Sequence, residues 1–318
     1  MRFLVRLVAA VIVLAALTVG VFAGMVLSDR SLPAATTQVV VPRGSALSEI
    51  ASQLADAHVI KSALAFRILA RVQRADSDVR AGAYRFPPSQ SMSDILRALE
   101  TGGAQVATWI TVPEGFTIDQ IAQRLQDNGI GQADETARAF RQEHLEGYLF
   151  PSTYLVPLDA TPAMVARQMN DEFIKELPTG APGRAKTLGI TIAQGVTVAS
   201  LVEREAKVDS DRPLIAGVIY NRLRLHMPLQ IDATIEYALP AHKAELSYAD
   251  LKIDSPYNTY THEGLPPTPI ANPGLPSLDA AFNPAHTDAL YYVYCGNGHH
   301  VFAKTLAEHQ ANVSRCLH

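Results

Sequence analysis

The sequence has little of what marks several common classes of protein. Its formal net charge of -4 provides no basic field, which argues against a nucleic-acid partner. Only 2 of its 318 residues are cysteines, neither of them in a recognisable nucleophile motif, and a G-x-S-x-G serine motif is absent. Repeats and low-complexity tracts are also missing. With 48% hydrophobic and 18% charged residues, the chain has a globular composition, and its length allows two domains with an accessory segment.

The first thirty residues have the features of a membrane anchor. Residues 7–27 contain no charged side chain and one polar side chain, and a helix of this length spans the hydrocarbon core of a bilayer. Arg2 and Arg6 precede this run and should stay in the cytoplasm, so the rest of the chain is expected in the periplasm. The alternative is a signal peptide cleaved near residues 21–23. The length of the run favours a retained, single-pass helix in the inner (cytoplasmic) membrane.

The residues after the anchor predict a small module within 31–103. Apolar periodicity and turn residues indicate a strand, two helices, a second strand and a further helix. Ser45 is the predicted N-cap of the first helix, and Ser91 with Asp94 predicts a capping box on the last. The predicted elements cover residues 38–41, 47–54, 62–72, 81–86 and 91–99.

The order strand, helix, helix, strand resembles the LysM-like module, which binds glycans containing N-acetylglucosamine. The matching residues are Val41, Gly44, Leu47, Ile50 and Ala51, together with the segment 81–86. Most of these apolar positions are expected to be core residues. The resemblance implies a glycan-binding module next to the membrane.

Residues 104–318 are predicted to form a mixed α/β domain. Residues 109–112 indicate a strand, 118–125 a helix with one apolar face, and 192–207 a strongly apolar helix. The segment 178–183 is rich in proline and glycine and is predicted to be a loop. The expected fold is therefore α+β, with an N-terminal transmembrane helix (1–30), a LysM-like βααβ module (31–103) and a mixed α/β domain (104–318).

Two acids, Glu203 and Glu205, lie near the end of the apolar helix. Their spacing places them about 200° apart around the helix axis. Glu205 follows Val198, Leu201 and Val202 on one apolar stripe, while Glu203 has Lys207 four residues later and is predicted to be a solvated, paired residue. Apolar surroundings disfavour the charged form of a carboxyl, so Glu205 is the predicted general acid.

An ordered series of motifs along the chain resembles the MltG (YceG-like) family of endolytic murein transglycosylases. The motifs are specific together, although each is weak alone, and they cover nearly the whole chain. The second acid of the family's E-x-E pair corresponds to Glu205, the residue that periodicity also selects. The matching segments are 113–115, 146–151, 199–205, 220–223, 229–237, 255–260 and 264–274.

The resemblance implies lytic transglycosylation of peptidoglycan glycan strands, without a cofactor or a metal. Glu205 would protonate the oxygen between N-acetylmuramic acid and N-acetylglucosamine, then remove a proton from the muramoyl 6-hydroxyl to leave a 1,6-anhydro end. Other polar residues of the matching motifs are expected to bind the sugars. These residues are Gln230, Asp232, Thr234, Tyr257, Asn258 and Tyr260.

Other features of the C-terminal part have weaker functional interpretations. His299, His300 and His309 could suggest a metal, but adjacent histidines usually point apart. Cys295 and Cys316 could form a disulfide in an oxidising compartment or remain separate thiols.

Two alternative functions remain open. One is a non-catalytic peptidoglycan-binding scaffold of the wall-synthesis machinery, and the other is a hydrolase that produces reducing ends. A membrane anchor also fits a partnership with membrane-bound peptidoglycan synthases, because it would confine cutting to nascent strands near the bilayer.

Overall fold

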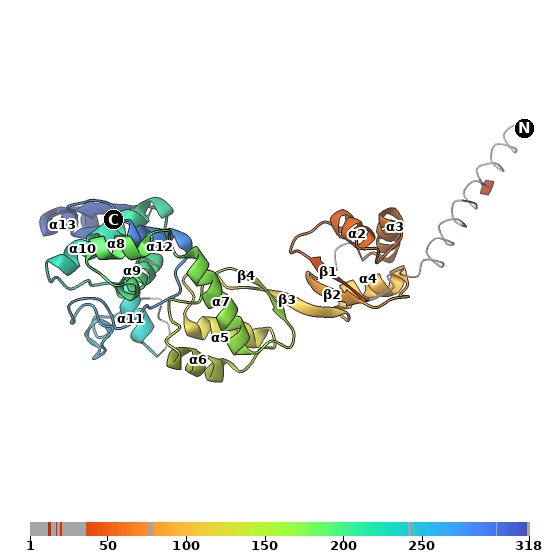
Figure 1. Cartoon of the computed structure of the whole chain (residues 1–318). Helices are drawn as coiled ribbons and strands as arrows, with labels where there is room; N and C mark the ends of the chain where they lie inside the picture. Colours follow the sequence, from red (N-terminus) through yellow and green to blue (C-terminus); the bar gives the residue numbers. More distant parts are fainter. Residues whose placement is uncertain are drawn as a thin grey trace, which may run out of the picture. The chain divides into compact units, whose positions relative to one another are not determined.

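The computed structural model describes most of the chain after the predicted anchor (Figure 1). The predicted transmembrane helix over 7–27 lies outside the described residues, apart from four isolated positions. Among the residues that are described, no single helix is both long and apolar enough to cross a membrane. The described residues are 12, 13, 17, 20, 36–75, 79–240, 243, 245–296 and 298–316.

The chain divides into two compact units. The first contains the residues up to 110 together with 154–159, and the second contains 111–153 and 160–318. Strand β3 (Gln105–Thr111) begins in the first unit and ends in the second. The domain limits predicted from the sequence therefore stay a prediction.

The first unit has the predicted order of strand, helix, helix and strand. β1 (Thr37–Val41) pairs antiparallel with β2 (Gly82–Phe86), so that Thr37 lies opposite Phe86. The connection contains α2 (Leu47–Asp56) and α3 (Ala63–Gln73). The four-stranded sheet continues in the order β1-β2-β3-β4, with β4 at Thr153–Pro157.

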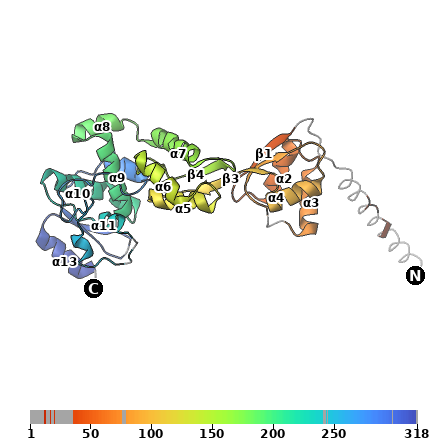
Figure 2. The ribbon, with the colours of Figure 1, turned by 90° about the horizontal axis from the view of Figure 1, so that it is seen from below.

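The helices of the first unit lie beside its strands (Figure 2), and their apolar side chains form one core with the sheet. Leu54 of α2, Phe66 of α3 and Tyr84 of β2 are fully buried. The third helix, α4 (Met92–Thr101), begins at the predicted capping box, in which the Asp94 backbone donates to the Ser91 hydroxyl over 3.1 Å. This capping box is confirmed.

The predicted N-cap of α2 is wrong by one residue. Ala46, not Ser45, occupies the cap position, and its backbone N–H donates to the Glu49 carboxylate over 3.1 Å. The glutamate three residues into the helix thus satisfies a backbone donor at the helix start without a hydroxyl at the cap.

The second unit is mainly helical, with a small antiparallel hairpin near its C-terminus. Its helices are labelled in Figures 1 and 2. The described elements are α5 (Ile118–Asp127), α6 (Ala133–Gln142), α7 (Pro162–Glu176), α8 (Ala181–Leu188), α9 (Ile192–Glu205), η1 (Asp209–Asp211), α10 (Arg212–Arg224), α11 (Asp232–Ala238), η2 (Asp250–Lys252), α12 (Leu275–Phe282), β5 (Tyr291–Tyr294), β6 (His300–Ala303) and α13 (Leu306–Cys316).

Helix α9 lies at the centre of this unit. Every residue from Gly195 to Val202 is buried, and the helix packs against α8, α10, α11 and α12. Gly195 is needed for this packing, because a Cβ there would lie 2.5 Å from the Phe282 ring of α12. The Ser200 hydroxyl donates to the Thr197 carbonyl and accepts from the Ile270 backbone, so the buried polar group is satisfied.

Two predicted limits in the second unit are wrong. The apolar helix ends at Glu205 and not at Lys207, because Ala206 adopts an extended backbone. The proposed loop over 178–183 ends early, because α8 begins at Ala181 with Pro182 in its first turn. Proline is tolerated there, since the first-turn N–H groups have no partner within the helix.

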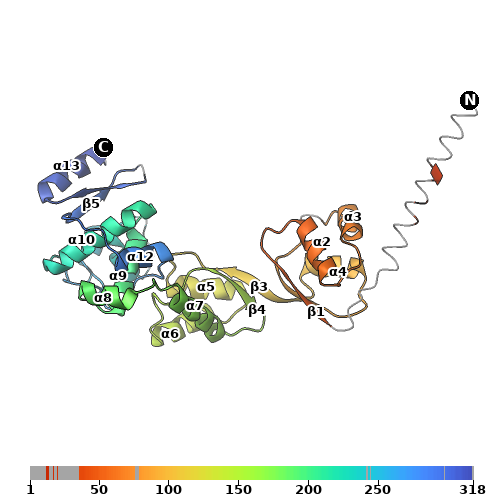
Figure 3. The ribbon, with the colours of Figure 1, turned by 45° about the horizontal axis from the view of Figure 1, so that its top comes forward.

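The C-terminal hairpin and helix α13 lie together (Figure 3). β5 pairs with β6 from Tyr291 opposite Ala303 to Tyr294 opposite His300. Cys295 and Cys316 are joined by a disulfide, with their Cα atoms 4.5 Å apart. The question that the sequence left open is thus answered, and the end of α13 is fastened to the hairpin.

Candidate active site

A cavity of about 700 Å³ in the second unit contains Glu205. Glu205 is the last residue of α9, and the next segments around the cavity are the start of α11, strand β5 and helix α13. Tyrosines, arginines and carboxylates surround the cavity, a composition suited to a polar ligand with sugar rings. The lining residues used below are Arg204, Glu205, Arg222, Gln230, Asp232, Ala233, Glu236, Tyr260 and Tyr292.

Glu205 is half-buried and has one hydrogen-bond donor in this cavity. Tyr292 donates its hydroxyl to the Glu205 carboxylate over 2.9 Å. Burial raises the pKa of Glu205 to about 7, and the negative charges of Asp232 and Glu236 add to the rise, while Tyr292 and Lys207 oppose it. A carboxyl with this pKa is partly protonated at neutral pH, as a general acid must be.

The apolar stripe that selected Glu205 is present. Val198, Leu201 and Val202 are fully buried. They place the end of α9 against the core, and the helix end brings Glu205 to the cavity wall. The catalytic role of Glu205 stays a prediction.

Glu203 differs from its predicted state. Its side chain is only 6% exposed and forms an ion pair with Arg212 at 3.4 Å, not with Lys207. It also accepts the Gly274 backbone N–H over 3.1 Å. The predicted pair with Lys207 requires helical spacing, which is lost because α9 ends at Glu205.

Arg222 organises the cavity although the sequence analysis gave it no role. It donates to the Leu229 carbonyl over 2.7 Å, to the Leu290 carbonyl over 2.6 Å and to the Gln230 side chain over 3.3 Å. Its guanidinium also lies 5.1 Å from the centre of the Tyr291 ring. Its position in a motif that matches the family was the one indication in the sequence that it could be functional. Its contacts join α10 to the segments that carry Gln230 and Tyr292.

Three of the six predicted sugar-binding residues line the Glu205 cavity. They are Gln230, Asp232 and Tyr260, and the Tyr260 hydroxyl donates to the Asp232 carboxylate. Gln230 has a positive φ of 53° and its backbone donates to the Thr259 carbonyl over 3.0 Å. Such a backbone conformation is uncommon outside glycine and often occurs at functional sites.

Thr234, Tyr257 and Asn258, the other three, have internal partners. Thr234 and Asn258 are fully buried. The Thr234 hydroxyl donates to the Ile231 carbonyl over 2.7 Å, and the Asn258 amide donates to the Ile253 carbonyl over 2.9 Å. Tyr257 lines an adjoining cavity and its hydroxyl hydrogen-bonds to that of Thr268 over 2.7 Å. These residues shape the walls, and their predicted contacts with substrate stay a prediction.

The adjoining cavity, of about 520 Å³, also lies within the second unit. It shares Arg204, Ala233 and Glu236 with the Glu205 cavity. Arg204 and Glu236 form an ion pair at 3.1 Å, so this pair stands at the junction of the two cavities. The two cavities are therefore neighbours that share part of their lining.

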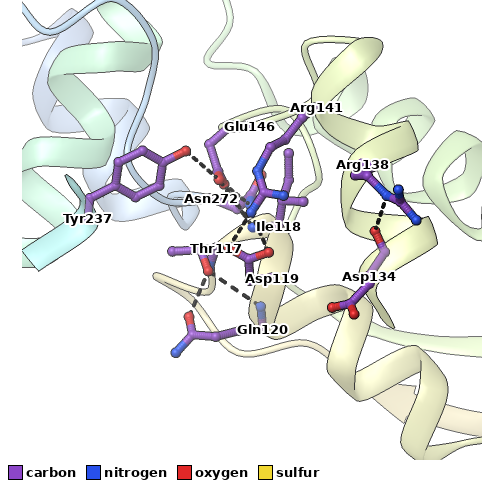
Figure 4. Close-up of polar contacts among 10 residues, drawn as sticks. All are labelled: Thr117, Ile118, Asp119, Gln120, Asp134, Arg138, Arg141, Glu146, Tyr237 and Asn272. Carbon is purple, nitrogen blue, oxygen red and sulfur yellow. Dashed lines mark hydrogen bonds and ion pairs between the residues drawn. The ribbon is translucent and has the colours of Figure 1, made fainter. Parts of the chain in front are cut away.

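A second glutamate with a raised pKa, Glu146, supports this adjoining cavity (Figure 4). Its carboxyl is buried and accepts from the Ile118 backbone over 3.1 Å, from the Tyr237 hydroxyl over 3.1 Å and from the Asn272 amide over 3.0 Å. Burial raises the pKa of Glu146 to about 7, against the lowering effect of the hydrogen bonds from Ile118 and Tyr237. The sequence indicated the motif around Glu146 but not this role.

The histidines have partners of their own. His300 donates its backbone N–H to the Asp211 carboxylate over 2.7 Å, and its Nδ1 lies 3.0 Å from the same group. Nδ1 of His299 lies 3.4 Å from the other Asp211 oxygen. Within the part of the chain that the structure describes, no group of three or more His, Cys, Asp or Glu side chains is placed to hold a metal ion.

The geometry of the site can be compared with known proteins. The model of a family described as YceG-like matches residues 39–315. The chain belongs to the YceG-like family. The resemblance found in its motifs is thereby confirmed.

Relatives of this YceG-like protein include an endolytic murein transglycosylase of Bacillus subtilis (strain 168), which is 38% identical over 302 residues. That match covers 86% of this chain and 83% of the relative. An endolytic murein transglycosylase of Streptococcus pneumoniae serotype 2 (strain D39 / NCTC 7466) is 33% identical over 318 residues, covering 87% of this chain and 57% of the relative. The crystal structure of a YceG-like protein from Listeria monocytogenes is similar with a TM-score of 0.62 and 31% identity, over 88% of this chain and 99% of that chain.

Proposed function

We propose that this YceG-like protein is an endolytic lytic transglycosylase of peptidoglycan, with Glu205 as its single general acid and base. Two relatives that match most of the chain are named endolytic murein transglycosylases. The observation that carries the assignment of Glu205 is its position as a half-buried carboxyl with a pKa raised to about 7 in a cavity of about 700 Å³.

In the first step, the protonated Glu205 carboxyl donates its proton to the oxygen that joins N-acetylmuramic acid to N-acetylglucosamine. The bond from muramoyl C1 to this oxygen breaks as positive charge develops on the sugar ring. The carboxylates of Asp232 and Glu236 lie close enough to raise the pKa of Glu205, so they favour its protonated form before the reaction.

In the second step, the Glu205 carboxylate removes the proton from the muramoyl 6-hydroxyl, whose oxygen bonds to C1. The product is a 1,6-anhydro end, and Glu205 is protonated again. One carboxyl suffices because the nucleophile is part of the substrate and no water has to be activated. Burial raises the pKa of Tyr292 well above its usual value, so its hydroxyl stays a donor and orients the Glu205 carboxylate.

A hydrolase is the second candidate, and one observation favours it. Asp232 lies in the same cavity as Glu205, so a second carboxylate is available to activate water. Its hydrogen bond from Tyr260 fixes the Asp232 side chain. A hydrolase would leave reducing ends in place of 1,6-anhydro ends.

The cellular setting is part of the same proposal. The apolar run at 7–27 supports a single-pass helix in the inner membrane, with the catalytic domain in the periplasm. The order β1-α2-α3-β2 in the first unit supports a LysM-like module that holds glycan. Together they would place cutting beside membrane-bound synthases, where nascent strands are terminated.

A digest of purified glycan strands by the full-length chain in mild detergent tests the proposal, with products identified by mass spectrometry. We expect 1,6-anhydro ends from the wild type and none from Glu205→Gln. Reducing ends that disappear in Asp232→Asn would establish the hydrolase. Equal products from the wild type and Glu205→Gln would remove Glu205 from the mechanism. Strand binding without any cutting would instead favour the non-catalytic scaffold.

A further inference from the structure

The cavity beside the Glu205 site has two ion pairs in its lining, one of its own and one that it shares with that site. Asp119 and Arg141 form one ion pair in this second cavity, and Arg204 and Glu236 form another. The Arg141 and Asp119 side chains are 47% and 64% exposed, so both can be reached from solvent. A polysaccharide backbone of N-acetylated sugars has no cationic group to offer these carboxylates, whereas a peptide carries groups of both signs.

Arg141 is the group most open to exchange. Its partner is a single exposed carboxylate, and an exposed ion pair contributes little to folding stability. A carboxylate of a ligand can therefore replace or share Asp119 at low cost, and a guanidinium binds such a group through two parallel hydrogen bonds. Arg141 projects from α6 toward Asp119 at the start of α5 (Figure 4).

Two backbone donors at the start of α5 already have acceptors. The first backbone N–H of α5, that of Ile118, is satisfied by Glu146, and the Gln120 backbone donates to the Thr117 hydroxyl over 3.4 Å. These two N–H groups therefore do not compete with Arg141 for an anion. The Tyr237 and Tyr257 rings, 5.0 Å apart, supply an apolar surface beside these charges.

We propose that this second cavity binds the peptide substituent of the glycan strand, with Arg141 receiving a peptide carboxylate. The inference rests on the proposed function, because peptidoglycan carries short peptides with free carboxylates on alternate sugars. A strand whose glycosidic bond lies at Glu205 can direct a peptide past the Arg204–Glu236 pair, which both cavities share. The cavity thereby makes the enzyme select strands that retain their peptides.

The test compares binding of two probes, glycan fragments with their peptides and the same fragments after an amidase has removed the peptides, which leaves a lactyl carboxylate on each N-acetylmuramic acid. The full-length chain carries Glu205→Gln so that binding is measured without cutting. We expect Arg141→Gln to weaken binding of the peptide-bearing fragment about tenfold and to leave binding of the stripped fragment unchanged. Asp119→Asn should strengthen binding of the peptide-bearing fragment, because it frees Arg141.

The matched control is Arg138→Gln, on the same helix. Arg138 is exposed and donates to the Asp134 carbonyl of its own helix over 3.2 Å, away from the cavity (Figure 4). Arg138→Gln should not change the affinity for either probe. Three results would each overturn the proposal. Arg141→Gln could weaken binding of both probes equally, or it could have no effect on either. The protein that retains Arg141 could also bind the two probes with equal affinity. So would a loss of binding in Asp119→Asn equal to that in Arg141→Gln, which would mark a structural ion pair.

This result is independent of whether Glu205 is the catalytic acid. If Glu205→Gln cuts strands as fast as the wild type, the assignment of Glu205 fails, and the effect of Arg141→Gln is then measured as the relative rate at which the two probes are cut. If Glu205→Gln is inactive and Arg141→Gln leaves the peptide preference intact, the peptide site fails alone.

Discussion

The hydrogen bond from Tyr292 to Glu205 predicts a measurable shift in pH dependence. This bond stabilises the ionised carboxylate and so holds the pKa of Glu205 below the value that burial alone would give. Tyr292→Phe keeps the ring and removes the donor. A hydrogen bond to a charged group is worth roughly 1.5–3 kcal/mol, and the partial exposure of Glu205 favours the lower end. Because about 1.4 kcal/mol corresponds to one pKa unit, the pKa should rise by about one unit.

The assay is the pH dependence of kcat/KM, which reports the ionisation of the free enzyme. The acid must be protonated, so activity falls as pH rises through the pKa of about 7. In Tyr292→Phe this fall should move to higher pH by about one unit. Peptide-free strands are the substrate, because they do not titrate in this range. Tyr294→Phe is the control, since the Tyr294 hydroxyl accepts from the Gly298 backbone and has no bond to Glu205. An unchanged profile, or a shift to lower pH, would refute the reasoning.

Three further predictions concern stability, each measured as the free energy of unfolding in denaturant. Burial gives folded Glu146 a pKa of about 7 against its ordinary 4.5, so its ionisation should lower the free energy of unfolding by about 3 kcal/mol as pH rises from 4.5 to 7; Glu146→Gln should remove this contribution and leave the similar one of Glu205. Gly195→Ala should cost about 1–3 kcal/mol, because its Cβ would meet the Phe282 ring, whereas Gly183→Ala, at an open position, should cost little. Arg212→Leu should cost about 3–5 kcal/mol by leaving Glu203 buried without a positively charged partner, and Glu203→Leu in addition should recover much of it.

Local patterns predicted the elements that depend on neighbouring residues. The sequence predicted the apolar face of α5 and the capping box of α4, because each pattern is formed by residues at most four positions apart. The end of α9 could not be predicted from such local patterns. Ala206 is a good helix former, yet it is extended in the structure. Its conformation follows from tertiary contacts, which override the weak preferences of single residues.

The same distinction applies to the candidate site. The stripe around Glu205 is a property of one helix, so periodicity identified it. Arg212, which pairs with Glu203, lies on another helix, and Asn258 bonds to carbonyls of an irregular loop. Neither contact is encoded in a spacing. The sequence named Asn258 through the family resemblance without orienting its side chain, and it gave no indication of Arg212.

The two acids at the end of α9 show how one helix can provide opposite electrostatic environments. Glu203 faces Arg212 and the Gly274 N–H at the start of α12, which compensate its charge inside the fold. Glu205 points to a cavity where Asp232 and Glu236 are also acidic, and Tyr292 is the donor that binds its carboxylate there. The first environment pairs the carboxylate with a guanidinium, and the second raises the pKa of Glu205. Because the helix ends between Glu205 and Ala206, the second acid reaches the cavity wall while the first stays packed against α12. The proposed proton donor therefore lies two residues from a glutamate that is paired inside the fold.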